Sequence, residues 1–212
     1  MDKLLAVPGN WSDKLKSGLA KLEIVASPEI EAKIIQHVAL IRDECQRVNL
    51  VSPRDRDYLI GQHVIPSLQG LKFIEDKKVR AICIGSGAGF PGIEVKLFRN
   101  DMELTLLEAT KKKALFLEKV VSQLGLEGVD VKWERAENLK EPLYDIAMAR
   151  AVAPMVKLQE WVAPLLKRGG KLIAWKGSRF KEEMRELKVP RFQVESVYPY
   201  EPPKIIVVLR KK

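Results

Sequence analysis

A cluster of glycines and one distant acid are the residues of this sequence whose spacing best suits ligand chemistry. Four glycines alternate with small residues directly after the apolar run 79–84: Gly85, Gly87, Gly89 and Gly92. Glycine lets the backbone turn tightly and leaves no Cβ between the main chain and a ligand. Glu108 ends a second apolar run, and a carboxylate at such a strand end can accept both hydroxyl protons of a ribose. The combination predicts a site for a ligand that contains a nucleoside.

The spacing of these glycines leaves two kinds of cofactor open. The last three glycines satisfy the dinucleotide pattern G-x-G-x-x-G, and Glu108 lies about where that site places its acid. Gly85 already ends the strand, however, so the loop is better phased from this residue. Phe90 and Pro91 then occupy the corner where a pyrophosphate needs open backbone. This phasing favours S-adenosylmethionine (AdoMet), which has a ribose but no phosphates; a dinucleotide and a purely structural glycine turn are the alternatives.

The composition is that of a globular protein with an excess of basic residues. Hydrophobic residues make up 46% of the 212 residues, and 37 basic against 28 acidic residues give a net charge of +9. This excess suits a polyanion such as nucleic acid, although it could serve solubility alone. Because we find no secretory signal and no apolar run that could span a bilayer, we expect a cytoplasmic protein without membrane contact. With two cysteines and two histidines, neither a disulfide framework nor a metal site is expected.

Residues 1–72 are predicted to form a helical region. The sequence Ser27-Pro28-Glu29 combines a cap, a proline at the first helical position and an acid in the first turn. Apolar residues then recur at spacings of three and four along one stripe of a long helix: Ile30, Ile34, Val38, Ile41, Cys45 and Val48. His37 borders this stripe, and we interpret it as a packing residue.

Two further helices are expected on either side of this long one. The first runs from Asn10 or Ser12, either of which can cap it, to about Glu23. The second runs from about residue 57 to 68 and carries His63, and Pro66 is expected to kink or end it.

From residue 73 to 212 strands and helices alternate, which predicts a parallel sheet with right-handed crossovers. After 79–84, strands are expected at the following runs: 103–109, 129–136, 144–149 and 171–175. One helix should open at Pro154 and end at 167–170, and a charged helix should follow Ser178 to about Lys188. The runs 192–198 and 205–209 are joined by a connector so short that they must pair antiparallel. We therefore divide the chain into regions 1–72 and 73–212.

Five parallel strands followed by an antiparallel hairpin is the architecture of Rossmann-like class I AdoMet-dependent methyltransferases. Within that class the sequence resembles the bacterial 16S rRNA guanine-N7 methyltransferase family (RsmG, glucose-inhibited division protein B). The resemblance extends from about residue 25 onward and is carried by an ordered set of motifs: Asn49-Leu50, Arg54-Asp55, His63 with Ser67, GSGAGFPGI (85–93), LLEATKKKALFL (106–117), Arg135-Ala136-Glu137, ARAVA (149–153), Gly169-Gly170 and Trp175-Lys176-Gly177. The combination is specific although each motif alone is weak.

The resemblance implies the site residues and the partner. The AdoMet contacts would be at strand ends and in the glycine loop: Gly85, Gly87, Phe90, Glu108, Ala136, Glu137 and Arg150. Residues that would face the substrate are Arg54, His63, Arg150 and Lys176. For His63, packing is an equal alternative. The implied partner is 16S rRNA, in the small ribosomal subunit or an assembly intermediate, and we expect a monomer.

Two positions depart from the family's pattern, because Cys83 and Pro66 stand where the family usually has aspartates. We expect Cys83 to end the first strand beside the methionine part of AdoMet. An acid placed there would then be only partly buried and would face the cationic amino group. On this basis we expect Cys83→Asp to tighten AdoMet binding or to leave it unchanged.

The end of the fourth strand indicates which reaction to expect. Residues 148–151 (Met-Ala-Arg-Ala) contain no Asn/Asp-Pro-Pro-Tyr motif for an exocyclic amine, no cysteine to attack a pyrimidine and no aspartate for ribose chemistry. Guanine N7 has an in-plane lone pair and carries no proton, so its methylation requires no general base. We therefore name no catalytic acid or base. A non-catalytic AdoMet- or RNA-binding assembly factor is the main alternative, and a dinucleotide-dependent oxidoreductase is a weaker one.

Overall fold

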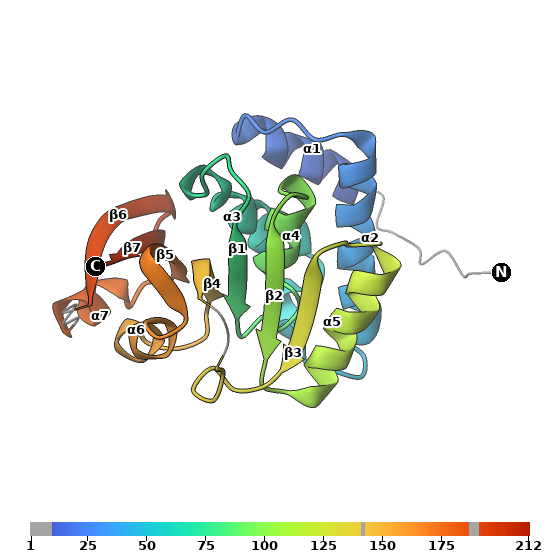
Figure 1. Ribbon diagram of the computed structural model, residues 1–212. Helices are drawn as coiled ribbons and strands as arrows, with labels where there is room; N and C mark the ends of the chain where they lie inside the picture. The colour runs from blue at the N-terminus through green and yellow to red at the C-terminus, as the bar shows by residue number, and fades with distance from the viewer. Residues whose placement is uncertain (1–9, 141–142, 187–190) are drawn as a thin grey trace.

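A seven-stranded sheet in the order β3-β2-β1-β4-β5-β7-β6 forms the centre of the fold (Figure 1). The computed structural model describes residues 10–140, 143–186 and 191–212. The strands are β1 Arg80–Ile84, β2 Glu103–Glu108, β3 Val129–Trp133, β4 Tyr144–Arg150, β5 Leu166–Lys176, β6 Phe192–Glu201 and β7 Lys204–Lys211. Strands β1 to β5 pair in parallel, whereas β7 is antiparallel to both β5 and β6. The predicted fold class, a mostly parallel sheet with an antiparallel C-terminal pair, is confirmed.

Helices lie on both faces of this sheet. They are α1 Trp11–Lys21, α2 Pro28–Glu44, the 3₁₀ turn η1 Pro53–Asp55, the π-helix η2 Ile60–Val64, α3 Ile65–Leu68, the 3₁₀ turn η3 Leu71–Phe73, α4 Gly92–Phe98, α5 Lys111–Gln123, α6 Met155–Val162 and α7 Phe180–Glu186. Figure 1 shows α2 and α5 beside β3, and α6 and α7 at the opposite side of the sheet near β5. Helix α2 begins as predicted, because the Ser27 hydroxyl accepts a hydrogen bond from the Ile30 amide at 3.3 Å.

The two faces of the sheet belong to different cores because strand side chains alternate in direction. Ala81 and Cys83 pack with helices α1 to α5 on one face, and Ile82 and Ile84 pack with α6 on the other. The N-terminal helices thus share a core with the first face of the sheet. The glycine loop after β1 lies against this shared core, since Ala88 and Phe90 are both buried in it.

Three predicted element boundaries were wrong. The helix expected from about residue 57 begins near Ile60 as the π-helix η2, and it ends at Leu68 as predicted. Pro66 does not end it, and lies just after the point where η2 changes to α3. Helix α6 ends at Val162 because Leu166 already pairs with Tyr144 as the start of β5. Strand β3 ends at Trp133, short of residue 136. The end predicted near Lys188 lies outside the described residues.

Candidate cofactor and substrate site

The sheet places two loops at a topological switch point between β1 and β4. The neighbours of β1 continue to β3 in one direction and to β6 in the other, and open α/β sheets bind ligands at the carboxyl ends of strands at such a point. Gly85, directly after β1, has φ +61°, and a Cβ there would lie 2.9 Å from Val152 Cγ2. Glycine is therefore required where the loop after β1 passes the loop after β4.

Glu108 binds the glycine loop through one carboxylate oxygen and the turn after β2 through the other. The Gly87 amide donates to Oε2 at 2.9 Å and the Thr110 amide donates to Oε1 at 2.9 Å. A Cβ on Gly87 would meet nothing closer than the Gly85 carbonyl oxygen at 3.9 Å, so the space above this glycine is open. Each carboxylate oxygen keeps a further lone pair for a hydroxyl group. The open cradle beside an acid at the end of β2 fits a ribose, and therefore fits AdoMet.

Two predicted adenine contacts follow β3 at the same edge of the sheet. The Glu134 amide donates to the main-chain carbonyl of Glu108 at 3.2 Å, which ties the segment after β3 to the end of β2. Ala136 is half-buried against the second core, whereas Glu137 is exposed. The structure thus brings these residues to the edge that carries Glu108, and their contact with adenine stays a prediction.

Phe90 connects the glycine loop to the N-terminal helical region. Its ring is buried, with its centroid 4.9 Å from that of His63 in a stacked arrangement and 5.3 Å from that of His37. His63 in turn lies 3.3 Å from the Asp55 carboxylate through Nε2. Burial, together with the charge of Arg150, lowers the pKa of His63 to about 4, so its imidazole is neutral at neutral pH. His63 thus packs on Phe90, and its contact with the substrate stays a prediction.

Arg150, at the carboxyl end of β4, clamps the helical region. One terminal nitrogen of its guanidinium donates to the His63 carbonyl at 3.0 Å and to Ser67 Oγ at 3.4 Å. The other terminal nitrogen donates to the Gln62 carbonyl. These acceptors lie in η2 and α3, so a single side chain connects β4 to both helices. Burial lowers the pKa of the guanidinium below its ordinary value.

A hollow of about 690 Å³ opens beside Arg150 at the carboxyl ends of β4 and β5. Its lining includes Lys176, Lys204 and Tyr200. Lys176 Nζ donates to the Ala153 carbonyl at 2.9 Å and lies 2.6 Å from the Glu183 carboxylate. Arg150, Lys176 and Lys204 line the hollow together with two acids, Glu182 and Glu183, and it has room for a nucleotide. Lys204 lies 2.9 Å from the Glu201 carboxylate. Arg54 is exposed in η1 and does not line this hollow.

The position of Cys83 was predicted wrongly. Cys83 is 0% exposed, and Ile84 is the last residue of β1. The Cys83 side chain faces α4, where a Cβ on Gly92 would lie 3.4 Å from the Cys83 sulfur. Burial, with smaller contributions from the charges of Glu94 and Glu108, raises the pKa of the Cys83 thiol to about 11. An acid at position 83 would be fully buried among acids.

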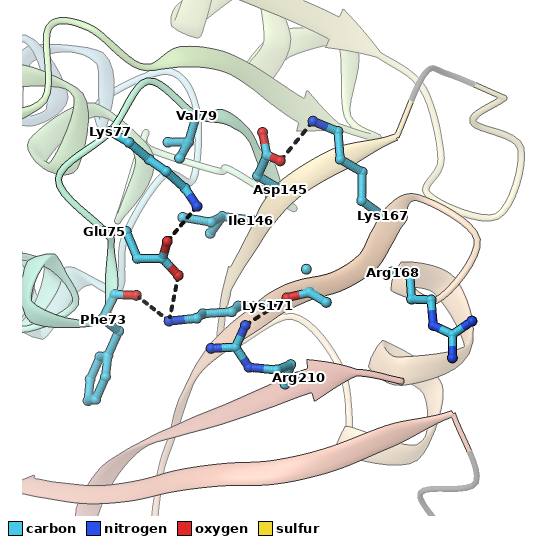
Figure 2. A pocket seen from close by; sticks show the side chains of 12 residues that line it. Phe73, Glu75, Lys77, Val79, Asp145, Ile146, Lys167, Arg168, Lys171 and Arg210 are labelled. Carbon is cyan, nitrogen blue, oxygen red and sulfur yellow. Dashed lines mark hydrogen bonds and ion pairs between the residues drawn. The ribbon is translucent and has the colours of Figure 1, made fainter.

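A second, smaller hollow of about 170 Å³ lies at the opposite edge, beside the amino ends of β4 and β5 (Figure 2). Although cations line it, most are paired with acids. Glu75 lies 2.6 Å from Lys77 and 3.6 Å from Lys171, and Asp145 lies 2.7 Å from Lys167. Because the switch point lies at the other edge of the sheet, we place the site at the carboxyl ends of the strands.

Neither a metal site nor a membrane span is found in the described part of the chain. Residues 10–140, 143–186 and 191–212 contain no group of three or more His, Cys, Asp or Glu side chains that could hold a metal ion. Within the same ranges, no helix is both long and apolar enough to cross a bilayer.

One buried acid beside the loop was missed from the sequence. Glu94 lies in the first turn of α4 and is 0% exposed, with its Oε1 atom 2.7 Å from Nδ1 of His37. The available signal was a charged residue flanked by Ile93 and Val95 directly after the glycines. Residues in such a position face the sheet or the helices that cover it.

Known proteins are similar to this chain in fold and in sequence. Similar solved structures include the ribosomal protein L11 methylase from Lactobacillus delbrueckii subsp. bulgaricus, with a TM-score of 0.61 and 13% identity over 71% of this chain and 79% of that one. Another is the T. thermophilus 16S rRNA N2 G1207 methyltransferase, with a TM-score of 0.53 and 18% identity over 69% of this chain and 39% of that one. At these identities the two structures support the fold alone.

The sequence relatives are closer. Ribosomal RNA small subunit methyltransferase G of Moorella thermoacetica is 39% identical over 173 residues, which cover 78% of this chain and 72% of the relative. The protein of the same name from Neisseria meningitidis is 31% identical over 207 residues, which cover 94% of this chain and 98% of the relative. The GidB family model, described as rRNA small subunit methyltransferase G, matches residues 30–205. The chain therefore belongs to the GidB family of rRNA small subunit methyltransferases.

Proposed function

We propose that this protein transfers a methyl group from AdoMet to N7 of a guanine in the 16S rRNA of the small ribosomal subunit. The observation that carries this proposal is the arrangement at the switch point. An open glycine loop, bonded to Glu108 through the Gly87 amide, lies on one side, and the hollow beside Arg150 lies on the other. Membership of the family supports the RNA class of the substrate.

The cofactor would be held by the carboxyl edge of β1 to β4. Gly85 and Gly87 give the main chain close access to it, Glu108 accepts hydrogen bonds from the ribose, and Ala136 and Glu137 lie on the adenine side. When bound, AdoMet supplies an electrophilic methyl group on a positively charged sulfur. Phe90 and Arg150 act on the cofactor side by fixing the loop and the end of β4 against the helical region.

On the substrate side, the protein has to bind and orient a purine. Lys176 and Lys204 line the hollow, each paired with a glutamate, and they would contact the phosphates of a nucleotide. Exposed Arg54 adds positive charge along the helical region. Because guanine N7 carries no proton, no side chain has to remove one. Holding the reacting atoms in line, roughly 3–3.5 Å apart, accounts for much of the rate enhancement.

Further properties of the protein are part of the same proposal. We place the enzyme in the cytoplasm, acting as a monomer on the small subunit or on an assembly intermediate. We also propose that residues 1–72 and 73–212 are its two structural regions, although both contribute to the first core.

The decisive experiment is methylation of 16S rRNA by the purified protein. Small subunits that lack the modification, and naked 16S rRNA, are incubated with protein and AdoMet, and N7-methylguanine is located by mass mapping. We expect one new N7-methylguanine, which Glu108→Ala should strongly reduce. AdoMet binding without methylation of either RNA substrate would support a non-catalytic assembly factor. Preferential binding of NAD in calorimetry would support the oxidoreductase.

A further inference from the structure

His37 makes two short polar contacts across the core beneath the glycine loop. Its Nε2 lies 2.8 Å from the carbonyl oxygen of Ala88, and its Nδ1 lies 2.7 Å from Oε1 of Glu94. Both side chains are 0% exposed. One imidazole from α2 therefore reaches both the glycine loop and the first turn of α4.

The chemistry of the partners fixes the hydrogen positions. A carbonyl oxygen only accepts, so Nε2 of His37 carries a hydrogen and donates it to Ala88. The contact between Nδ1 and Glu94 then contains one proton, whichever of the two atoms holds it. The two side chains together are electrically neutral in either arrangement. A neutral pair is compatible with their complete burial.

The imidazole ring also packs closely against the glycine loop. A Cβ on Gly89 would lie 3.0 Å from Nε2 of His37, which leaves no room for a side chain. The His37 ring is tilted against that of Phe90 at a centroid distance of 5.3 Å. His37 thus bonds to Ala88 and packs on Phe90, and it occupies the space that a side chain on Gly89 would need.

Packing alone gives a poor account of this pair. Well-packed apolar residues commonly replace a buried charged pair without loss of stability, and here Oε2 of Glu94 is buried without a hydrogen-bond partner. A buried polar pair that costs stability in this way is explained if its hydrogen bonds fix the conformation of the glycine loop. We infer that His37 is a positioning residue that sets the glycine loop for AdoMet, a role that rests on the proposed function.

The test compares His37→Phe with a variant of the neighbouring residue on the same helix. His37→Phe keeps a ring but removes both hydrogen bonds. Val38→Ala is the control, because Val38 is also 0% exposed and belongs to the same core but makes no hydrogen bond to the loop. His37→Gln keeps a donor for Ala88 and is measured as well, which also covers the case in which His37→Phe does not fold. Each variant is measured for Tm, for AdoMet affinity by calorimetry, and for hydrogen exchange.

In His37→Phe we expect AdoMet affinity to fall by about tenfold and the Gly89 and Ile93 amides to exchange faster. The Gly89 and Ile93 amides donate to Ser86 and Gly89 carbonyls within the loop and α4, so they report on the loop directly. His37→Gln should recover part of both effects, and Val38→Ala should lower Tm without either. Affinity and loop exchange in His37→Phe that match those of Val38→Ala would overturn the inference. Absence of AdoMet binding in the wild-type protein would refute the proposed function instead, while the exchange measurement would still test the loop.

Discussion

Replacing Cys83 by aspartate tests how the space beneath the glycine loop is built. Burial raises the pKa of the Cys83 thiol from 9.0 to about 11. Each tenfold change in an ionisation constant is worth about 1.4 kcal/mol, so one negative charge at this position costs about 3 kcal/mol more in the folded protein than in water. A carboxylate is subject to the same burial and to the same repulsion by Glu94 and Glu108. This structure therefore reverses the sequence-based expectation that the change would be neutral or favourable for AdoMet binding.

We expect Cys83→Asp to lower Tm by about 6–12 °C at neutral pH, which is what a loss of about 3 kcal/mol produces in a domain of this size. Cys83→Ser is the matched control, since it is small, polar and uncharged, and it should cost much less. The loss should also depend on pH. A buried carboxyl has a folded-state pKa above its unfolded value of about 3.9. Below about pH 4 both states are protonated and the loss nearly disappears. It grows as the pH rises, and it is complete above the folded-state pKa.

The assay is thermal unfolding of the wild-type protein and both variants between pH 4 and 8, with AdoMet affinity measured by calorimetry at neutral pH. A Cys83→Asp variant that keeps the wild-type Tm at neutral pH and binds AdoMet more tightly would refute this reasoning. That result would mean that position 83 is open to the cofactor, in contradiction to its complete burial.

Four further predictions concern the site and the clamp around it. Glu108→Ala should weaken AdoMet binding by about 1–3 kcal/mol in calorimetry, and an unchanged affinity would remove Glu108 from the site. Arg150→Lys should lower Tm by several degrees, because a single ammonium cannot reach the carbonyls of both Gln62 and His63 as the forked guanidinium does; an unchanged Tm would contradict the clamp. Burial lowers the pKa of His63 from 6.5 to about 4, so on acidification the unfolded chain takes up a proton at this imidazole before the folded protein does. His63 therefore leaves the free energy of unfolding unchanged above pH 6.5 and lowers it by up to about 3 kcal/mol as the pH falls through 4. His63→Gln should lack this part of the pH dependence of Tm. Profiles of Tm against pH that coincide for the wild-type protein and the variant would contradict the prediction. Finally, the net charge of +9 predicts that log K for RNA falls with log salt, with a slope of about −0.7 per neutralised phosphate on single strands; a flat response would exclude electrostatic binding.

The sequence was sufficient to predict the sheet and its ligand edge. Apolar runs that end in glycine or in a single acid specify where parallel strands stop, and parallel strands present those ends at one edge. This is why Gly85 and Glu108 were correctly expected at the same edge of the sheet. The helix start at Ser27 followed equally from local chemistry, because a cap acts on amides only a few residues away.

Contacts across the chain were beyond sequence reasoning. His37 was interpreted as a packing residue and is indeed buried, but its polar partners lie 51 and 57 residues away, and no local pattern identifies them. Arg150 was assigned to the pocket by its place at a strand end, whereas its donors also reach carbonyls 87 and 88 residues earlier. The burial of Cys83 depends on how closely α4 packs on β1, and this distance is set by Gly92 together with the whole helical layer.

The position of β7 in the sheet has a consequence for the nascent chain. Although β7 is the last of the described strands in sequence, it lies between β5 and β6. Among the described strands, β6 pairs with β7 alone. While the ribosome is still adding residues 204–211, β6 therefore has no neighbour and the outer edge of β5 is open. A chain interrupted after residue 203 would lose two strands of the sheet, and protease cleavage within 192–201 of such a truncated chain would reveal it.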